Sequence, residues 1–121
     1  MKIVNYVDVT PEEYGHGITK RDVITADEAP TFHMRVFELP PGVGHPPHSH
    51  PFEHEVIVLS GQGIWTDGQK EYQTKKGDCM YIASGEKHGC ANNGKEVFRI
   101  ACLIPVLATC RAEDIEECFP L

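Results

Sequence analysis

The sequence has no apolar run that approaches the roughly 20 residues needed to span a membrane. Its opening residues, MKIVNYVDVT, also lack the pattern of a signal peptide. Basic residues are few, with 11 Lys and Arg against 18 Asp and Glu, and they are scattered along the chain. Nucleic acids and anionic membranes both require a basic patch. We therefore expect a cytoplasmic protein with no nucleic-acid or membrane partner.

The five cysteines include no CxxC pair. An odd number at this spacing fits neither the disulfide framework of a secreted protein nor a thiolate zinc site. We expect most of them to be reduced thiols that pack as small apolar side chains. Cys110 and Cys118 lie in the tail ATCRAEDIEECFPL, where they could pair or bind metal, although no recognised ligand spacing is present and their role stays open.

Helical periodicity is nearly absent. At 121 residues, with 40% hydrophobic and 24% charged residues, the chain can form one domain with its own core. Short strands, with turn signals about every eight to twelve residues, predict an all-β fold, either a closed antiparallel barrel or a jelly roll. Two segments are expected to be helical: Thr10–Glu13, which has an N-cap Thr followed by Pro, and the acidic tail, residues 109–121.

The strands are expected between recognisable turns. One strand covers residues 31–39, and a second runs through the histidine-rich segment to residue 59. Asp67-Gly68 predicts a two-residue hairpin turn, and residues 92–94 predict another hairpin turn. The remaining strands are expected at residues 64–66, 71–74, 79–82, 88–92 and 97–104.

Four histidines, His48, His50, His54 and His88, form the most informative pattern. The first three lie within the segment HSHPFEH, and a regular strand would direct all three to one side. Prolines within residues 46–51 forbid a helix here, which excludes the helical zinc-protease motif. The four imidazoles together predict a metal site.

An acidic ligand is an alternative to His54. If the strand is regular, residues 54, 56 and 58 share the inner face, and Glu53 and Glu55 point outward. A bulge at Pro51 would change that register and could bring Glu55 into the site. We favour His54 and keep Glu55 open.

Two motifs resemble those of the cupins. Residues 42–61 follow the first cupin motif with the spacing G(x)5HxH(x)3H(x)6G, and His54 stands where most members have Glu. Residues 77–92 follow the second motif as G(x)5AxG(x)2H(x)3N, with Ala83 in place of the usual Pro. The segments HSHPFEH and ACLIP are similar to those of a small four-histidine subgroup, which includes manganese binders with oxidative activity.

The resemblance implies a cupin double-stranded β-helix, that is, a jelly-roll β-barrel, with metal near one mouth and frequent homodimers. The barrel is expected over residues 30–108. Residues 1–29 contribute an N-terminal strand and turns to the same domain, and residues 109–121 form a tail that the resemblance does not explain. The outward apolar residues Ile57 and Leu59 would be covered either by a dimer partner or by the N-terminal strand.

Strand alternation predicts the cavity wall. If His88 points inward, so does Cys90, and Phe98, Ile100, Cys102 and Ile104 share a face opposite Arg99. Arg35 could clamp a carboxylate with two parallel hydrogen bonds, although an Arg on a strand is more often solvated. His16 and His33 carry no functional signal. The candidate pocket residues are Arg35, His45, Cys90, Ile100, Cys102 and Ile104.

The expected cofactor is a divalent metal ion. Four nitrogen ligands on an octahedral ion leave two positions for water, dioxygen or substrate. Mn or Fe is favoured by the resemblance, whereas imidazole also suits Ni, Zn and Cu. The favoured function is an oxidoreductase of dioxygenase type acting on a small molecule. Two alternatives stay open: a small-ligand-binding or sensing protein without activity, and an isomerase or lyase without redox chemistry.

Overall fold

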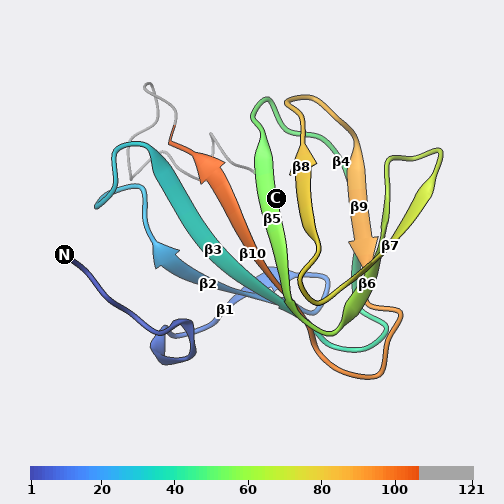
Figure 1. Ribbon diagram of the computed structural model, residues 1–121, viewed down its shortest axis with the longest axis horizontal. Helices are drawn as coiled ribbons and strands as arrows, with labels where there is room; N and C mark the ends of the chain where they lie inside the picture. Colours follow the sequence, from blue (N-terminus) through green and yellow to red (C-terminus); the bar gives the residue numbers. More distant parts are fainter. Residues whose placement is uncertain (107–121) are drawn as a thin grey trace.

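The computed structural model describes residues 1–106, which form two antiparallel β-sheets (Figure 1). The elements are η1 (Tyr6–Asp8), β1 (Glu12–Gly15), β2 (Ile18–Ile24), β3 (Phe32–Leu39), β4 (Gly44–His48), β5 (His54–Ser60), β6 (Gln62–Thr66), β7 (Glu71–Lys75), β8 (Cys79–Ile82), β9 (His88–Ala91) and β10 (Phe98–Pro105). In this part of the chain no helix has the length and apolar character required to cross a membrane. The predicted tail helix, Cys110 and Cys118 lie outside the described residues.

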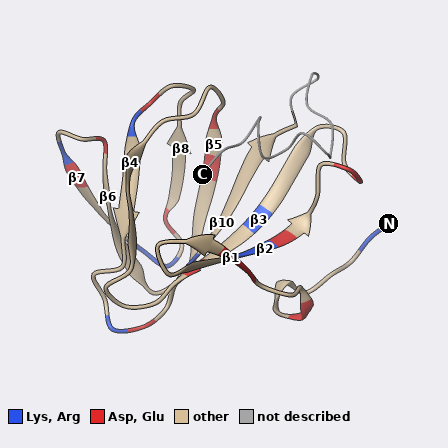
Figure 2. Cartoon of the chain, turned by 180° about the vertical axis from the view of Figure 1, so that it is seen from behind, with Lys and Arg blue, Asp and Glu red and all other residues tan. Residues whose placement is uncertain are grey.

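The chain passes back and forth between the two sheets. The six-stranded sheet has the order β1-β2-β3-β10-β5-β8, and the four-stranded sheet has the order β4-β9-β6-β7. Figure 1 shows the two sheets close together at one end and spread apart at the other, where the metal-motif segments lie. Figure 2 shows the charged residues mainly at loops and strand ends. The predicted all-β jelly-roll fold is confirmed.

The core lies between the sheets and is centred on β10. This strand pairs with β3 on one side and β5 on the other. Its burial alternates as predicted, because Phe98, Ile100, Cys102 and Ile104 are buried whereas Arg99 is partly exposed. Alternation follows from the strand period of two, which directs successive side chains to opposite faces. The same period places the inner residues of β5 in this core.

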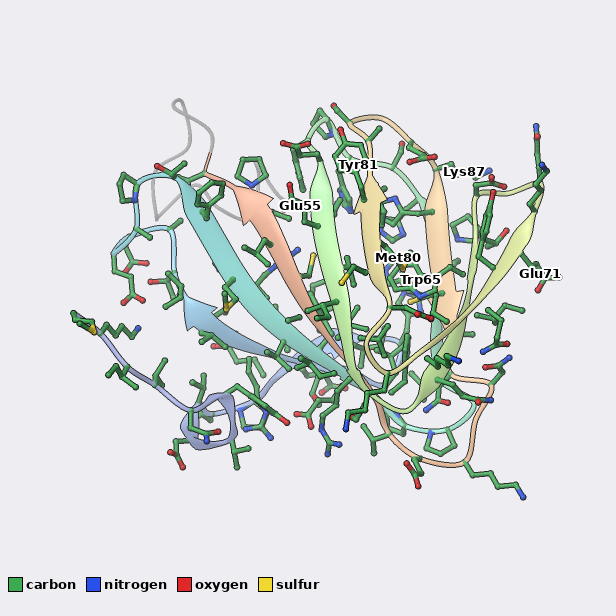
Figure 3. All side chains as sticks on the ribbon, in the orientation of Figure 1. Glu55, Trp65, Glu71, Met80, Tyr81 and Lys87 are labelled. Carbon is green, nitrogen blue, oxygen red and sulfur yellow. The ribbon has the colours of Figure 1, made fainter. Side chains whose placement is uncertain are left out.

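The opposite face of β5 carries exposed residues. Glu55 pairs with Tyr81 of β8 in the strand register, and both side chains are exposed (Figure 3). Ile57 is 38% exposed. Leu59, in contrast, packs against a second apolar cluster formed by Val23, Val36 and Ala101, and Val4 of the N-terminal segment packs against the same cluster. The N-terminal segment and Leu59 therefore share this cluster, and a dimer contact at Ile57 stays a prediction.

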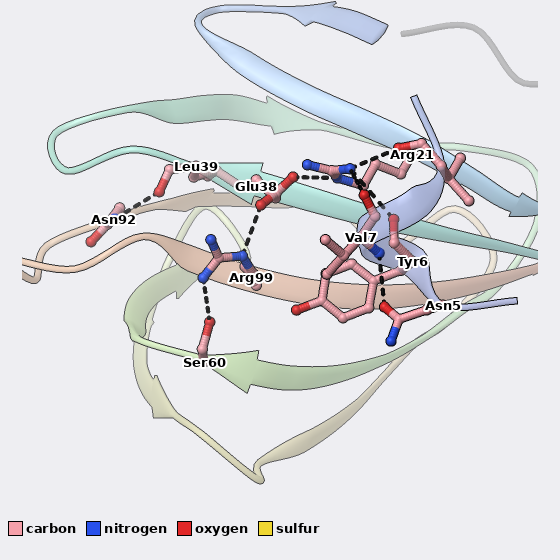
Figure 4. A network of polar contacts seen from close by, with 10 residues as sticks. Asn5, Tyr6, Val7, Arg21, Glu38, Leu39, Ser60, Asn92 and Arg99 are labelled. Atoms are coloured by element: carbon pink, nitrogen blue, oxygen red, sulfur yellow. Dashed lines mark hydrogen bonds and ion pairs between the residues drawn. The ribbon is translucent and has the colours of Figure 1, made fainter. Parts of the chain in front are cut away.

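A polar network joins the N-terminal segment to the outer face of the six-stranded sheet (Figure 4). Glu38 accepts hydrogen bonds from Arg21 Nε at 2.6 Å and from Arg99 Nε at 2.7 Å. Arg99 Nη1 also donates to Ser60 Oγ at 3.3 Å. Arg21 Nη1 donates to three backbone carbonyls of the N-terminal segment, those of Tyr6, Val7 and Val9. One carboxylate thus fixes two arginines and, through Arg21, the chain before β1.

The expected N-terminal helical turn differs from the structure. The helical turn predicted at Thr10–Glu13 is wrong, because Glu12 begins β1 and pairs with Lys20 of β2. The backbone bonds of this pairing outweigh the local capping preference. The short helical turn instead lies at η1, where Asn5 Oδ1 accepts from Val7 N at 3.0 Å.

Two hairpin expectations also need correction. The turn after β6 has four residues, Asp67–Lys70, because Asp67 Oδ1 accepts from the amides of Gln69 and Lys70, both at 2.8 Å. Residues 92–94 do not close a hairpin, since β9 and β10 belong to different sheets. Asn92 holds this crossing by donating to the carbonyls of Leu39 and Glu96, both at 2.8 Å.

We predict that Glu38→Gln lowers the free energy of unfolding by about 1–3 kcal/mol at neutral pH, because two charge-assisted hydrogen bonds are weakened. Burial acts to raise the pKa of Glu38, but the hydrogen bonds and charges of Arg21 and Arg99 outweigh it and hold the pKa below 4.5. The stabilisation is therefore complete above pH 4.5 and is lost as the pH falls through the lowered pKa of the folded protein.

Urea denaturation at neutral pH and at steps below pH 4.5 checks this prediction, with the difference between the two proteins shrinking in acid. Glu71→Gln, at an exposed position on β7, is the matched control and should change stability by less than about 0.5 kcal/mol. An equal effect of the two substitutions, or a gap that is independent of pH, would contradict the role of Glu38.

Candidate metal centre

The histidines come from both sheets because the chain changes sheet between them. β4 ends at His48, β5 begins at His54, and the crossing segment, residues 49–53, contains His50. The prediction of one continuous strand is therefore wrong. Pro51 lies in the crossing, and it has no backbone N–H with which to extend a strand ladder. The last histidine, His88, begins β9 and pairs with His48 in the register of the four-stranded sheet.

Three of the four predicted ligands meet closely. One ring nitrogen from each of His48, His50 and His88 lies within 4.8 Å of the other two. His54 borders this group, with its ring centroid 5.0 Å from that of His88 and 5.2 Å from that of His50. The structure therefore places a three-histidine cluster at the mouth of the sandwich with a fourth imidazole beside it.

In His48 and His88, hydrogen bonds determine which ring nitrogen carries the proton and which keeps its lone pair. His48 Nδ1 lies 2.9 Å from the carbonyl oxygen of Pro46, and His88 Nδ1 lies 2.9 Å from that of Glu86. A carbonyl only accepts, so each Nδ1 carries the proton and Nε2 keeps its lone pair. Metal-binding histidines are commonly fixed in this way. Both rings are therefore prepared to bind a cation through Nε2.

His54 is held by a different partner. Its Nδ1 lies 3.4 Å from Cys102 Sγ, and its Nε2 is buried with no hydrogen-bond partner. An unpaired buried nitrogen is costly, and a cation is one group that would satisfy it. His50 has its ring stacked on Phe52, with centroids 4.9 Å apart and planes inclined by 15°. The donor set fits a divalent ion that accepts imidazole ligands.

The four imidazoles are uncharged at neutral pH. Burial is the main cause of the lowered pKa of each ring, and neighbouring cationic groups add to it for all four. The pKa falls to about 4 for His50 and to about 3 for His54. Neutral imidazole is the form that binds metal, so no proton has to leave before binding.

A small cavity of about 70 Å³ adjoins the histidines. Among the described residues, no Asp or Glu lines it, and Glu53 and Glu55 are exposed, Glu55 on the outer face of β5. The geometry thus gives no support to Glu55 as a ligand. The wall is largely apolar, and its apolar members include Ile18, Phe37, Leu39, Val56, Trp65, Ile82 and Ile100.

Five of the six predicted pocket residues line this cavity: Arg35, His45, Cys90, Ile100 and Cys102. Ile104 is instead buried in the core, at 1% exposure, and is not a lining residue. Tyr14 also lines the cavity, with its ring in edge contact with Phe37 at 4.8 Å between centroids. Sequence reasoning missed Tyr14 because it follows the segment that was expected to be a helical turn.

The cysteines near the site are neutral thiols. Burial raises the pKa of Cys90 to about 12 and also raises that of Cys102. Cys102 is buried and Cys90 partly buried, as expected for small apolar side chains, whereas Cys79 is exposed. All three are free cysteines. Cys102 therefore contributes a weak hydrogen-bonding sulfur to the site and no negative charge.

Comparison with known proteins agrees with this geometry. An oxalate-binding protein of Thermotoga maritima is 30% identical over 114 residues, which cover 87% of this chain and 94% of that protein. The polyketide cyclase RemF of Streptomyces resistomycificus is 31% identical with a TM-score of 0.80, covering 88% of this chain and 80% of that chain. A predicted oxalate decarboxylase of Thermotoga maritima is 25% identical with a TM-score of 0.77, covering 88% of this chain and 100% of that chain. Residues 35–104 match the cupin domain family. The chain therefore belongs to the cupins.

Proposed function

We propose that this protein is a metal-dependent cupin whose divalent ion is held by His48, His50, His54 and His88. The observation that carries the proposal is the set of four neutral, converging imidazoles, two of which, His48 and His88, have Nδ1 held by a carbonyl and Nε2 available. A bound ion would supply Lewis acidity and, as Mn or Fe, one-electron redox chemistry. The His54 ring lies beside the other three, with its centroid 5.0 Å from that of His88 and 5.2 Å from that of His50.

The protein's own residues define what such a site accepts. The ligand set is neutral, so the full positive charge of a divalent ion would remain to attract an oxygen-bearing ligand. The apolar wall, formed by residues such as Trp65 and Ile100, limits access of water. A volume of about 70 Å³ restricts the ligand to a small molecule, since sites for drug-sized molecules measure roughly 300–1,000 Å³.

We favour an oxidoreductase of dioxygenase type as the activity. Among the described residues no carboxylate lines the cavity, which disfavours a decarboxylase that relies on a carboxylate base. The mostly apolar wall disfavours sugar isomerases and lyases, which need several polar groups around their substrate. A second candidate, a small-ligand-binding protein without activity, is favoured by the similarity to the oxalate-binding protein of Thermotoga maritima.

The ligand assignment predicts the metal content. The purified protein should hold about one divalent ion per chain, measured by elemental analysis. His88→Ala should abolish binding, because it removes a ligand of the three-histidine cluster whose tautomer is fixed. His54→Ala should weaken binding by at least about tenfold, because one of four nitrogen ligands is lost. His16→Ala, at an exposed histidine outside the cluster, is the matched control. If His54→Ala binds the metal with unchanged affinity, His54 is not a ligand and the centre consists of the other three histidines.

The proposed dioxygenase-type activity predicts that the protein consumes dioxygen. Protein loaded with Mn or Fe should consume dioxygen when given at least one of oxalate, pyruvate and catechol, whereas protein loaded with redox-inert Zn should not. An oxygen electrode measures this, with His88→Ala as the control for unbound metal. If both metal forms bind a ligand and neither consumes dioxygen, the oxidoreductase proposal is wrong and the proposal of a small-ligand-binding protein is favoured.

A further inference from the structure

We infer that Arg35 is an anion-binding residue of the cavity and that the ligand is a small carboxylate held between Arg35 and the histidine cluster. This inference rests on the proposed metal site and names its class of ligand. Arg35 lies on β3, is 6% exposed, and lines the same cavity as the four histidines.

Arg35 has no acidic partner among the described residues. None of the ion pairs within residues 1–106 includes it, whereas Arg21 and Arg99 on the outer face share Glu38. Its Nε is buried without a hydrogen-bond partner, and its Nη2 donates to Cys102 Sγ at 3.4 Å, a weak acceptor. The guanidinium carbon lies 4.9 Å from the centre of the Phe37 ring. A buried cation with such partners is incompletely compensated.

The neighbouring groups do not supply the missing negative charge. Burial raises the pKa of Tyr14, and the charge of Arg35 and its hydrogen bond to the Tyr14 side chain oppose this effect without cancelling it. Tyr14 is therefore a neutral partner of Arg35, and burial also keeps the Cys102 thiol neutral. Asp22 lies opposite Arg35 in the strand register, but it contacts His33 at 3.3 Å and Lys20 at 3.4 Å. The partners of the guanidinium among the described residues are therefore uncharged, and a planar carboxylate matches its donors with two parallel hydrogen bonds.

Cys102 links this cation to the candidate metal centre. It pairs with Arg35 across β3 and β10, and its sulfur lies 3.4 Å from both Arg35 Nη2 and His54 Nδ1. A ligand between Arg35 and the histidines therefore has to be short. The volume of about 70 Å³ is several times the roughly 10–15 Å³ that a cavity needs to hold one water molecule. Acetate, pyruvate and oxalate are of this size, and each carries a carboxylate for Arg35 and an atom that can face the histidines.

The test compares each carboxylate with a neutral analogue. Zn-loaded protein is titrated by calorimetry with acetate and pyruvate, and with acetamide and pyruvamide as uncharged controls. We expect at least one carboxylate to bind ten times or more tightly than its amide. Arg35→Met should remove that preference, and Arg35→Lys, which keeps the charge but lacks the planar donor pair, should lose part of it.

Lys20→Met is the matched control, because it removes one positive charge from β2 at a position that does not line the cavity. It should retain the preference for the carboxylate. Equal carboxylate affinity in wild type and Arg35→Met would overturn the inference, as would equal losses in Lys20→Met and Arg35→Met. If Arg35→Met does not fold, the same comparison is made with Arg35→Lys, and wild-type affinity there overturns the requirement for the guanidinium.

Two further measurements separate this inference from the proposed metal site. Arg35→Met should keep about one Zn per chain, and its ligand-free Tm should equal or exceed that of the wild type, since an incompletely paired buried charge is removed. A lower Tm with retained carboxylate binding would make Arg35 a structural residue. If the wild type binds no Zn, the metal proposal fails, while titration of the metal-free protein still decides whether Arg35 selects carboxylates.

Discussion

The burial of three uncharged imidazoles and the partial burial of a fourth, that of His48, between two sheets is the constraint on which the site depends. Removal from water lowers the pKa of each ring, and the carbonyls of Pro46 and Glu86 direct Nε2 of two rings toward the cluster. Such a group of buried lone pairs is unfavourable when nothing satisfies it. The fold can sustain this arrangement because the large side chains of Phe98, Leu39, Ile104 and Val58 are fully buried in the core. The packed core therefore offsets the unfavourable free energy of burying these polar rings.

Much of the fold could be predicted because burial on one face leaves a period of two in the sequence. This rule identified the inner faces of β5 and β10 and the outward position of Glu55. Motif spacing identified the histidines before any geometry was known. The break between β4 and β5 could not be predicted, because a strand that changes sheet keeps its alternation on both sides of the crossing. The same difficulty applied to residues 92–94, where turn-forming residues look alike in a hairpin and in a crossing.

Other features depended on tertiary contacts that leave no local pattern. The strand at Glu12 forms because β2 supplies its partner, although the local sequence favours a capped helical turn. Tyr14 reaches the cavity only because that strand forms. The contact of Cys102 with both Arg35 and His54 joins three strands that are distant in sequence. The sequence could suggest that Arg35 meets a carboxylate, but its burial without an acidic partner required the structure.

The crossing of the chain between His48 and His54 has a consequence for the motions of the molecule. Ligands on β4 and β9 belong to one sheet, and His54 on β5 belongs to the other, at the end where the sheets spread apart. An ion bound to all four would cross-link the two sheets. Any binding that favours the closed arrangement lowers the population of open ones. Opening of the two sheets and binding of the ion would then be linked equilibria. A low concentration of the ion would raise the population of open conformations at the end where the histidines lie.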